Sequence, residues 1–382
     1  MDQPSIIVAI LTVFYGLFEW NFHSYKRFGG SAPARWPSVS VLVPCRNEAK
    51  RIAENITSLL KQDYPGGLEV IVLDDCSNDG TEDILRNLEK QNKRLRVICG
   101  KELPIGWQGK NFACHQLSEA AKNEWMLFVD ADTNHDPKSV EMAVRTATSR
   151  GASLISTFPR QKFGSFGDEL VVPLMFYVLL TYLPMFFVQK RTWKWAGNFA
   201  TACGQYLLVE SKAYREAGGH GAVKGRISEG PLLATWIKNS GRKILLVDGS
   251  RYVSCRMYEN LKQAWEGFSR SVFASMGGSV GALIFFLAFQ TYVLVFPYIL
   301  LAMGLANGTL TPETTAKLAL CIAFPIIQRL RIHLRTGMSL RGIPFHALSI
   351  CLYHLIMINS FIHYRVRKNT VWKNRVYVEP QA

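Results

Sequence analysis

The sequence predicts an α/β protein with a mostly parallel, Rossmann-like sheet and flanking helices, joined to helices that enter a membrane. Three observations support this prediction. Between residues 38 and 129, short β-branched runs alternate with helical patterns, as in sheets built from right-handed crossovers. Three of the predicted strands end at or just before acidic residues. Long apolar segments lie towards both ends of the chain, where membrane helices are expected.

The strands and helices of this region follow from the residue patterns. After the first β-branched run, Ile52, Ile56 and Leu59 recur at helical spacing. The last strand is apolar almost throughout, which is typical of a strand buried on both faces. In chain order we expect strands at 38–43, 68–73, 95–98 and 124–129, and helices at about 52–60, 82–91 and 112–121.

Acidic residues follow three of the predicted strands. Glu48 follows the first strand, Asp74 and Asp75 follow the second, and Asp130 and Asp132 follow the strand at 124–129. The carboxyl ends of parallel strands meet at one edge of a sheet, where ligands bind. Carboxylates there suit a divalent cation that bridges to phosphate oxygens. An Asp at a strand end can also be ordinary turn chemistry, and only the convergence of the three clusters favours a phosphate site.

Composition favours a membrane protein over a nucleic-acid-binding one. The chain has 382 residues, a formal net charge of +15 and a mean hydropathy of +0.06. Its basic residues cluster beside the apolar segments, as expected where a chain meets anionic lipid headgroups. No nucleic-acid-binding motif is present. The 8 cysteines are scattered without metal-ligand spacing, so we expect a soluble domain in a reducing, cytoplasmic compartment and no structural metal site.

The apolar segments divide the chain. We expect a protein of the cell membrane that crosses it several times, with the soluble domain on the cytoplasmic side. An apolar stretch at about 170–190, closed by Lys190 and Arg191, is interpreted as a membrane-surface helix, with a true span as the alternative. The candidate C-terminal spans are 280–305, 316–327, which is short for a span, and 343–362. Three full C-terminal crossings would put the basic tail outside, so we expect that one of the predicted spans does not cross fully. The expected regions are an anchor at 1–30, a soluble domain at 37–275, membrane segments within 280–364 and a basic cytoplasmic tail at 365–382.

Three motifs resemble those of family 2 glycosyltransferases of GT-A fold. They are Pro44-x-Arg46-Asn47-Glu48, Asp74-Asp75-x-Ser77-x-Asp79-Gly80-Thr81 and Asp130-x-Asp132. Their order and spacing match that family, and the resemblance covers roughly residues 37–275.

Shorter stretches are similar to bacterial membrane-bound carotenoid glycosyltransferases of the diaponeurosporenoate type, and hopanoid-associated relatives share much of the pattern. This resemblance implies an inverting transfer of a sugar, glucose in that group, from a UDP-sugar to a lipid such as a carotenoid or related terpenoid. The stretches are Gly109–Cys114, Gly218–His220, Ile227–Gly230, Arg256–Tyr258 and Trp265–Gly267.

The resemblance also implies roles for single residues. Asp132 would hold Mg²⁺ or Mn²⁺ against the diphosphate. His220, Trp265 and Arg270 would lie on the acceptor or diphosphate side, although a loop histidine and a membrane-surface helix explain the first two equally well. The residues expected to bind the nucleotide sugar are Pro44, Arg46, Glu48, Asp74, Asp75, Lys110, Asp130 and Ala131.

The general base departs from the family pattern. Relatives commonly carry Glu-Asp at this motif, with the Asp as base, whereas this chain reads Glu229-Gly230. Glu229 is the only carboxylate left there, so we assign it the role of base. A carboxylic acid acceptor would need little deprotonation, and the altered motif would then matter less.

The sequence gives less support to three other functions. A processive polysaccharide synthase would carry an intact Gln-x-x-Arg-Trp motif where this chain has Trp265 and Arg270, and more membrane spans. A nucleotidyltransferase would place a Gly-rich basic loop directly after its first strand. A non-catalytic membrane scaffold is supported only by the missing Asp at Gly230.

Overall fold

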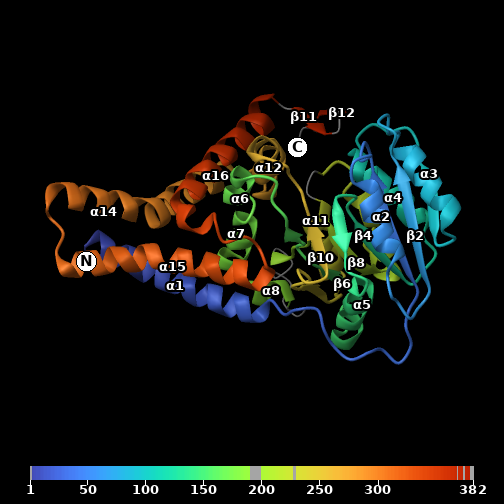
Figure 1. Cartoon of the computed structure of the whole chain (residues 1–382), viewed down its shortest axis with the longest axis horizontal. Helices are drawn as coiled ribbons and strands as arrows, with labels where there is room; N and C mark the ends of the chain where they lie inside the picture. The colour runs from blue at the N-terminus through green and yellow to red at the C-terminus, as the bar shows by residue number, and fades with distance from the viewer. Residues whose placement is uncertain (1, 190–198, 227–228, 368, 373–374, 379–382) are drawn as a thin grey trace. The chain divides into compact units, whose positions relative to one another are not determined.

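The computed structural model describes residues 2–189, 199–226, 229–367, 369–372 and 375–378. Lys190 and Arg191, predicted to close the apolar stretch, and Ile227 and Ser228 of the predicted base motif lie outside the described residues. The chain forms two compact units (Figure 1). The α/β unit comprises 25–160, 185–256 and 371–382, and the helical unit comprises 1–24, 161–184 and 257–370.

A seven-stranded sheet with the order β3-β2-β1-β4-β8-β6-β9 forms the core of the α/β unit. Neighbouring strands pair in parallel except β8, which is antiparallel to both β4 and β6. The predicted α/β class with a mostly parallel sheet is therefore confirmed. The strands are β1 (Val39–Cys45), β2 (Leu68–Asp74), β3 (Leu95–Cys99), β4 (Trp125–Val129), β6 (Leu154–Ser156), β8 (Tyr206–Glu210) and β9 (Ile244–Leu246).

Helices flank this sheet (Figure 1). Val41, Val70 and Leu127, on the three adjacent strands β1, β2 and β4, are fully buried in one hydrophobic core. The apolar runs in the sequence predicted these strands because a strand covered on both faces carries few polar residues. The helices of the unit are α2 (Ile52–Leu60), α3 (Thr81–Gln91), α4 (Gly109–Ala120), α5 (Ser139–Arg150), α8 (Met185–Gln189), α9 (Ser211–Glu216), α10 (Gly219–Ala222) and α11 (Glu229–Asn239).

The register of the sheet brings three strand ends together. Cys45, the last residue of β1, pairs with Asp74, the last residue of β2. β4 pairs in parallel with the other side of β1 and ends just before Asp130. The three acidic clusters therefore lie at one edge of the sheet, as predicted.

A smaller sheet follows directly after Asp132. Its strands are β5 (Thr133–His135), β10 (Val253–Cys255) and β7 (Arg160–Gln161), in the order β5-β10-β7. β5 and β10 are antiparallel, with Thr133 opposite Cys255. A separate pair, β11 (Asn369–Trp372) and β12 (Arg375–Val378), lies near the C-terminus.

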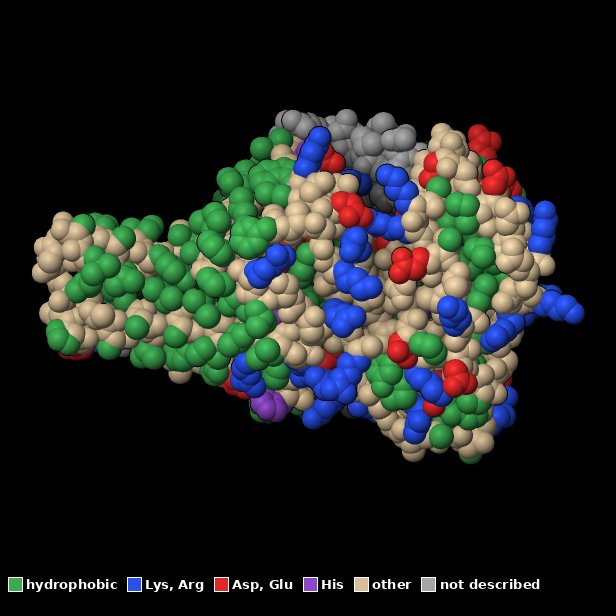
Figure 2. Space-filling view, in the orientation of Figure 1, with side chains coloured by type: hydrophobic (Ala, Val, Ile, Leu, Met, Phe, Trp, Pro, Cys, Tyr) green, Lys and Arg blue, Asp and Glu red, His purple; other side chains and the backbone are tan. Residues whose placement is uncertain are grey.

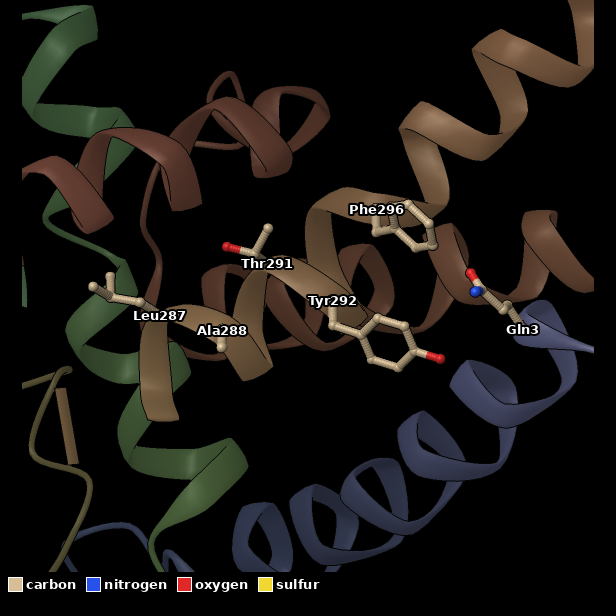
Figure 3. Close-up of a pocket in the computed structure, with 6 residues that line it drawn as sticks. All are labelled: Gln3, Leu287, Ala288, Thr291, Tyr292 and Phe296. Atoms are coloured by element: carbon tan, nitrogen blue, oxygen red, sulfur yellow. The ribbon is translucent and has the colours of Figure 1, made fainter. Parts of the chain in front are cut away.

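The helical unit contains three helices that are long and apolar enough to cross a membrane, judged by length and composition among the described residues. They span Gln3–Ser24, Val280–Asn307 and Ile343–Arg365. Figure 2 shows many hydrophobic side chains on the visible faces of α14 and α15. The elements of the unit are α1 (Gln3–Ser24), α6 (Phe166–Val171), α7 (Leu174–Tyr182), α12 (Leu261–Ser275), α13 (Val280–Gln290), η2 (Thr291–Val295), α14 (Phe296–Asn307), α15 (Pro312–Thr336), η3 (Ile343–Phe345), α16 (His346–Phe361) and η4 (Ile362–Arg367).

Two helical segments and the boundary of the soluble domain differ from the prediction. The stretch at 170–190 is divided into α6, α7 and α8 instead of one helix, because Pro173 and Pro184 interrupt it. The short segment expected at 316–327 is part of the 25-residue helix α15, which continues through Arg329, Arg331 and Arg335. Residues 161–184 and 257–275, predicted within the soluble domain, belong to the helical unit because α6, α7 and α12 pack against other helices of that unit.

α1 and α15 run parallel and are joined by ion pairs near both ends. Lys317 Nζ lies 3.1 Å from Asp2 Oδ2 at one end. At the other end Arg331 pairs with Glu19, and the guanidinium of Arg335 donates to the carbonyl oxygen of Phe22. The basic end of α15 therefore lies beside the C-terminal end of α1.

Candidate active site

The loops after β1 and β2 are tied to each other. Asn47 adopts a left-handed backbone conformation with φ of 53°, which Asn tolerates better than most residues, and its N–H donates to the Ser77 hydroxyl at 2.9 Å. The Arg46 guanidinium donates to the carbonyl oxygens of Asp75 and Cys76, the latter at 3.0 Å. The two motifs predicted to bind the nucleotide are therefore in direct contact.

Two carboxylates of the second motif, the predicted binding residue Asp74 and its neighbour Asp79, hold these loops in place. Asp74 is 3% exposed, and its carboxylate accepts from the backbone N–H of Ser77 at 3.2 Å. Asp79 accepts from the backbone N–H of Ala49 and of Thr81, each at 3.1 Å. The turn-forming alternative weighed in the sequence therefore describes part of what these carboxylates do.

Lys110 connects two carboxylates that are 99 positions apart in the chain. Its Nζ lies 2.8 Å from Asp130 Oδ1 and 3.0 Å from Glu229 Oε1. Lys110 stands in the first turn of α4, which begins at Gly109, earlier than the helix predicted from about residue 112. A small cavity of about 10 Å³ beside this pair is lined by Pro44, Lys110, Asp130, His220 and Glu229, among others.

The charges in this cluster depend on one another. Burial acts to lower the pKa of Lys110, but Asp130 and Glu229 outweigh it and hold that pKa well above its usual value. Burial acts to raise the pKa of Glu229, but the ion pair with Lys110 outweighs it and lowers that pKa. For Asp130 burial prevails over Lys110, and the pKa is raised. Lys110 and Glu229 are therefore both ionised at neutral pH.

The carboxylate of Asp132 fits a divalent cation. Burial, together with the nearby carboxylates of Asp130 and Glu48, raises the pKa of Asp132 to about 7. Its Oδ1 is buried and has no hydrogen-bond partner in the described part of the chain. No group of three His, Cys, Asp or Glu side chains among the described residues is placed to hold a metal by itself. A cation here would take further ligands from substrate phosphates, as Mg²⁺ commonly does.

Gly204 makes room for the Lys110–Glu229 pair, and Gly230 allows the backbone of Ala202 to approach. A Cβ atom on Gly204 would lie 2.6 Å from Glu229 Oε1 and 3.2 Å from Lys110 Nζ. A Cβ atom on Gly230 would lie 2.8 Å from the carbonyl oxygen of Ala202. Glu229 itself is 8% exposed at the start of α11. The backbone around position 230 therefore leaves no room for the Asp side chain that relatives commonly carry there.

His220 lies beneath the site. It is 4% exposed, its Nδ1 is 2.7 Å from the Tyr214 hydroxyl, and its ring packs on Phe128 with a centroid separation of 4.9 Å. Burial lowers the pKa of His220 to about 3, so the ring is neutral. Its contact with an acceptor stays a prediction.

Trp265 and Arg270 belong to α12 of the helical unit. Trp265 packs against a cluster that contains Leu170, Val171 and Ala264. The Arg270 side chain donates to the carbonyl oxygen of Glu266 at 3.1 Å, one turn earlier in the same helix. Their predicted place on the acceptor or diphosphate side is not tested by these contacts.

Two further residues shape the site and were not assigned a role from the sequence. The Asn111 amide donates to the carbonyl oxygens of Val223 at 2.9 Å and Arg226 at 2.8 Å, and so anchors the chain just before Glu229 to the start of α4. Cys255 interacts with the Asp132 carboxylate from β10. Asn111 stands next to Lys110 in a motif, and this position could have indicated its role from the sequence. Cys255 carries no such signal, because only the pairing of β10 with β5 brings it close to Asp132.

Comparison with known proteins agrees with this geometry. Residues 40–217 match the family described as Glycosyl transferase family 2. This segment contains β2, β4 and all but the first residue of β1, together with the three strand-end clusters and Lys110.

Individual relatives extend the likeness to more of the chain. The chain is 25% identical over 352 residues to a 4,4'-diaponeurosporenoate glycosyltransferase of Staphylococcus haemolyticus, covering 89% of this chain and 88% of the relative. A protein of that name from Staphylococcus aureus strain USA300 is 26% identical over 247 residues, which is 63% of this chain and 62% of that relative. The fold is similar to that of the mannosyltransferase PcManGT from Pyrobaculum calidifontis, solved with GDP-Man and Mn²⁺, with a TM-score of 0.56, 18% identity and coverage of 96% of this chain and 100% of that one.

Proposed function

The chain carries a family 2 glycosyltransferase domain, and on that premise we propose that it moves a sugar, glucose in the first instance, from a UDP-sugar to a membrane lipid. The acceptor class is a carotenoid or related terpenoid with a carboxylate or hydroxyl group, in line with the names of the relatives. The observation that carries this proposal is the cluster of Lys110, Asp130, Asp132 and Glu229 at the carboxyl edge of the parallel strands.

The donor would bind across the loops after β1, β2 and β4. Pro44, Arg46 and Glu48 lie on the first of these loops, and Asp75 follows the second. Asp130 and Asp132 would hold Mg²⁺ or Mn²⁺, which neutralises the charge that develops on the leaving diphosphate. The orphaned Oδ1 of Asp132 supports this assignment, and Lys110 is placed to bind the same diphosphate.

Transfer would break the bond between the sugar carbon and the diphosphate oxygen while an acceptor oxygen bonds to the opposite face of that carbon. With a hydroxyl acceptor, the proton passes to Glu229, which Lys110 keeps ionised. The lowered pKa makes Glu229 a weak base, because a base works best with a pKa near the operating pH. A carboxylate acceptor has no proton to lose, so it suits this site better.

The helical unit would place the protein in the membrane, where the acceptor is dissolved. α1 and α15 run parallel, and the basic end of α15 lies beside the C-terminal end of α1. By the positive-inside rule both ends would face the cytoplasm, together with the glycosyltransferase domain.

The test is sugar transfer by membranes that contain the protein, with radiolabelled UDP-glucose, Mn²⁺ and extracted pigmented lipids. We expect label in an organic-soluble lipid, with the label lost in Asp132→Ala and kept in Asp83→Asn, a control on the exposed start of α3. Label in a long water-soluble polymer would favour the processive synthase instead. Absence of transfer from any common nucleotide sugar would overturn the proposal.

A further inference from the structure

The turn that carries Asp130 and Asp132 rests on three buried polar side chains that no step proposed above uses. They are Asn55 of α2 and Thr133 and His135 of β5, and they are 1%, 2% and 3% exposed. None of them belongs to the three motifs. A buried polar group is unfavourable unless it is hydrogen-bonded, so their convergence on one turn needs a physical reason.

The carbonyl oxygen of Asp130 is the centre of this arrangement. It accepts from the backbone N–H of Thr133 at 3.2 Å, from the Thr133 hydroxyl at 2.7 Å and from the Asn55 amide at 3.3 Å. The same amide donates to the carbonyl oxygen of Thr133 at 2.7 Å. The backbone is therefore held at both ends of the turn, and Asp132 lies between the two fixed points.

The direction of each hydrogen bond is determined by donor counting. The Thr133 hydroxyl gives its only proton to Asp130, so its oxygen accepts from His135 Nε2 at 2.8 Å. His135 is thus protonated on Nε2, and burial lowers its pKa to about 3, which keeps the ring neutral. The backbone N–H of His135 donates to the Ser58 hydroxyl of α2 at 3.1 Å. A change at any of the three side chains therefore reaches the turn.

We propose that Asn55, Thr133 and His135 are positioning residues for the metal site, which fix the direction in which the carboxylates of Asp130 and Asp132 present themselves to a divalent cation. The inference rests on the metal-dependent function proposed above and adds residues to it. Groups that orient metal ligands without touching the metal typically change metal affinity by about 10–100-fold when they are mutated.

The experiment measures Mn²⁺ binding directly, without turnover. Full-length protein in nanodiscs is titrated with Mn²⁺, and the free ion is followed by its electron paramagnetic resonance signal. Thr133→Val keeps the shape of the side chain but removes the hydroxyl, and Thr133→Ser restores the hydroxyl. Thr146→Val is the matched control, because Thr146 is also fully buried and its hydroxyl donates to the carbonyl oxygen of Met142 within α5.

We expect the Kd for Mn²⁺ to rise about 10-fold or more in Thr133→Val, and to stay near the wild-type value in Thr133→Ser and Thr146→Val. In turnover, Thr133→Val should raise the Mn²⁺ concentration for half-maximal rate more than it lowers kcat. Equal Mn²⁺ affinity in Thr133→Val and wild type would overturn the inference. If Thr133→Val does not fold, Thr133→Ala takes its place, because it also removes the hydroxyl and adds no methyl group to the buried site. Absence of Mn²⁺ binding by the wild type would instead contradict the metal dependence of the proposed function.

Discussion

The α-carbon of Gly230 faces the carbonyl oxygen of Ala202 so closely that a Cβ atom on it would lie 2.8 Å from that oxygen. By its resemblance to family 2 glycosyltransferases, position 230 is where those enzymes commonly carry the carboxylate taken as base. The backbone packing at this position excludes any side chain unless the chain shifts, so Glu229 is the carboxylate that remains.

Restoring the family residue should therefore impair the protein. We expect Gly230→Asp and Gly230→Ala to lower the melting temperature, since overpacking typically costs about 1–3 kcal/mol, and to reduce transfer. Gly29→Ala is the control, because a Cβ there meets nothing within 4 Å. Thermal unfolding measures the loss of stability, and the transfer assay measures the loss of activity. Wild-type stability and full activity in Gly230→Asp would contradict this account of the motif.

Lys110 should matter through its two ion pairs. In Lys110→Met, Asp130 and Glu229 lose the cation between them, and the diphosphate loses a positive partner. We expect transfer to fall about 100-fold, the scale of losing one electrostatic group at a reacting centre. Lys224→Met, at an exposed lysine of the same unit, should leave the rate unchanged. A solvated, non-functional Lys110 would give similar rates in both variants.

Glu229 should be needed only when the acceptor carries a proton. We expect Glu229→Gln to abolish transfer to a hydroxyl acceptor and to leave UDP-sugar binding intact. Transfer to a carboxylic acid acceptor should largely survive, because that acceptor is already ionised at neutral pH. The test compares the transfer rates of wild type and Glu229→Gln, measured side by side with a terpenoid alcohol and with a terpenoid acid. Equal rates of wild type and Glu229→Gln on the alcohol would remove Glu229 from the role of base.

Metal binding should weaken as the pH falls through about 7. The pKa of Asp132 is raised to about 7, mainly by burial, and only its ionised form binds a cation. Below that pH the proton competes with the metal, so Mn²⁺ should raise the melting temperature more at pH 8 than at pH 6. His135 and His220 have pKa values lowered to about 3 and stay neutral throughout this range. A Mn²⁺ effect that does not change between pH 6 and pH 8 would contradict the assignment of Asp132.

The cysteines test which side of the membrane holds the α/β unit. Cys76 and Cys99 are exposed in this unit, whereas Cys114, Cys203 and Cys255 are buried. An impermeant maleimide should therefore label the protein in inside-out vesicles and not in intact spheroplasts. The double variant Cys76→Ser/Cys99→Ser should lose most of this label. Labelling of the wild type in intact spheroplasts that the double variant loses would place the unit on the other side.

The sequence predicts the sheet edge better than it predicts the site around it. The strand-end clusters follow from buried apolar runs and from parallel pairing, which puts Asp74 and Asp130 at one edge. The closeness of Gly230 to Ala202 depends on how two distant loops pack, and no local pattern reports it. Thr133 and Asn55 were missed for the same reason, because their partners are backbone carbonyls.

The helical unit shows a second limit. Arg329 looks like the basic end of a membrane segment, yet it is 1% exposed. Its guanidinium donates to the carbonyl oxygens of Glu169 at 3.3 Å and Leu170 at 3.1 Å. Pro173 has no N–H to offer the Glu169 carbonyl, so Arg329 supplies the missing donor. The positions of basic residues in the sequence cannot show that Arg329 binds backbone carbonyl oxygens of a distant helix.

The most direct test of the central claim is a calorimetric titration of UDP into the full-length protein in nanodiscs, with and without Mn²⁺. If the strand-end carboxylates form the donor site, UDP binds in the presence of Mn²⁺, much more weakly without it, and weakly in Asp132→Asn under both conditions. Asp83→Asn should bind as the wild type does. Binding of UDP that is equally tight without Mn²⁺ and in Asp132→Asn would contradict the claim.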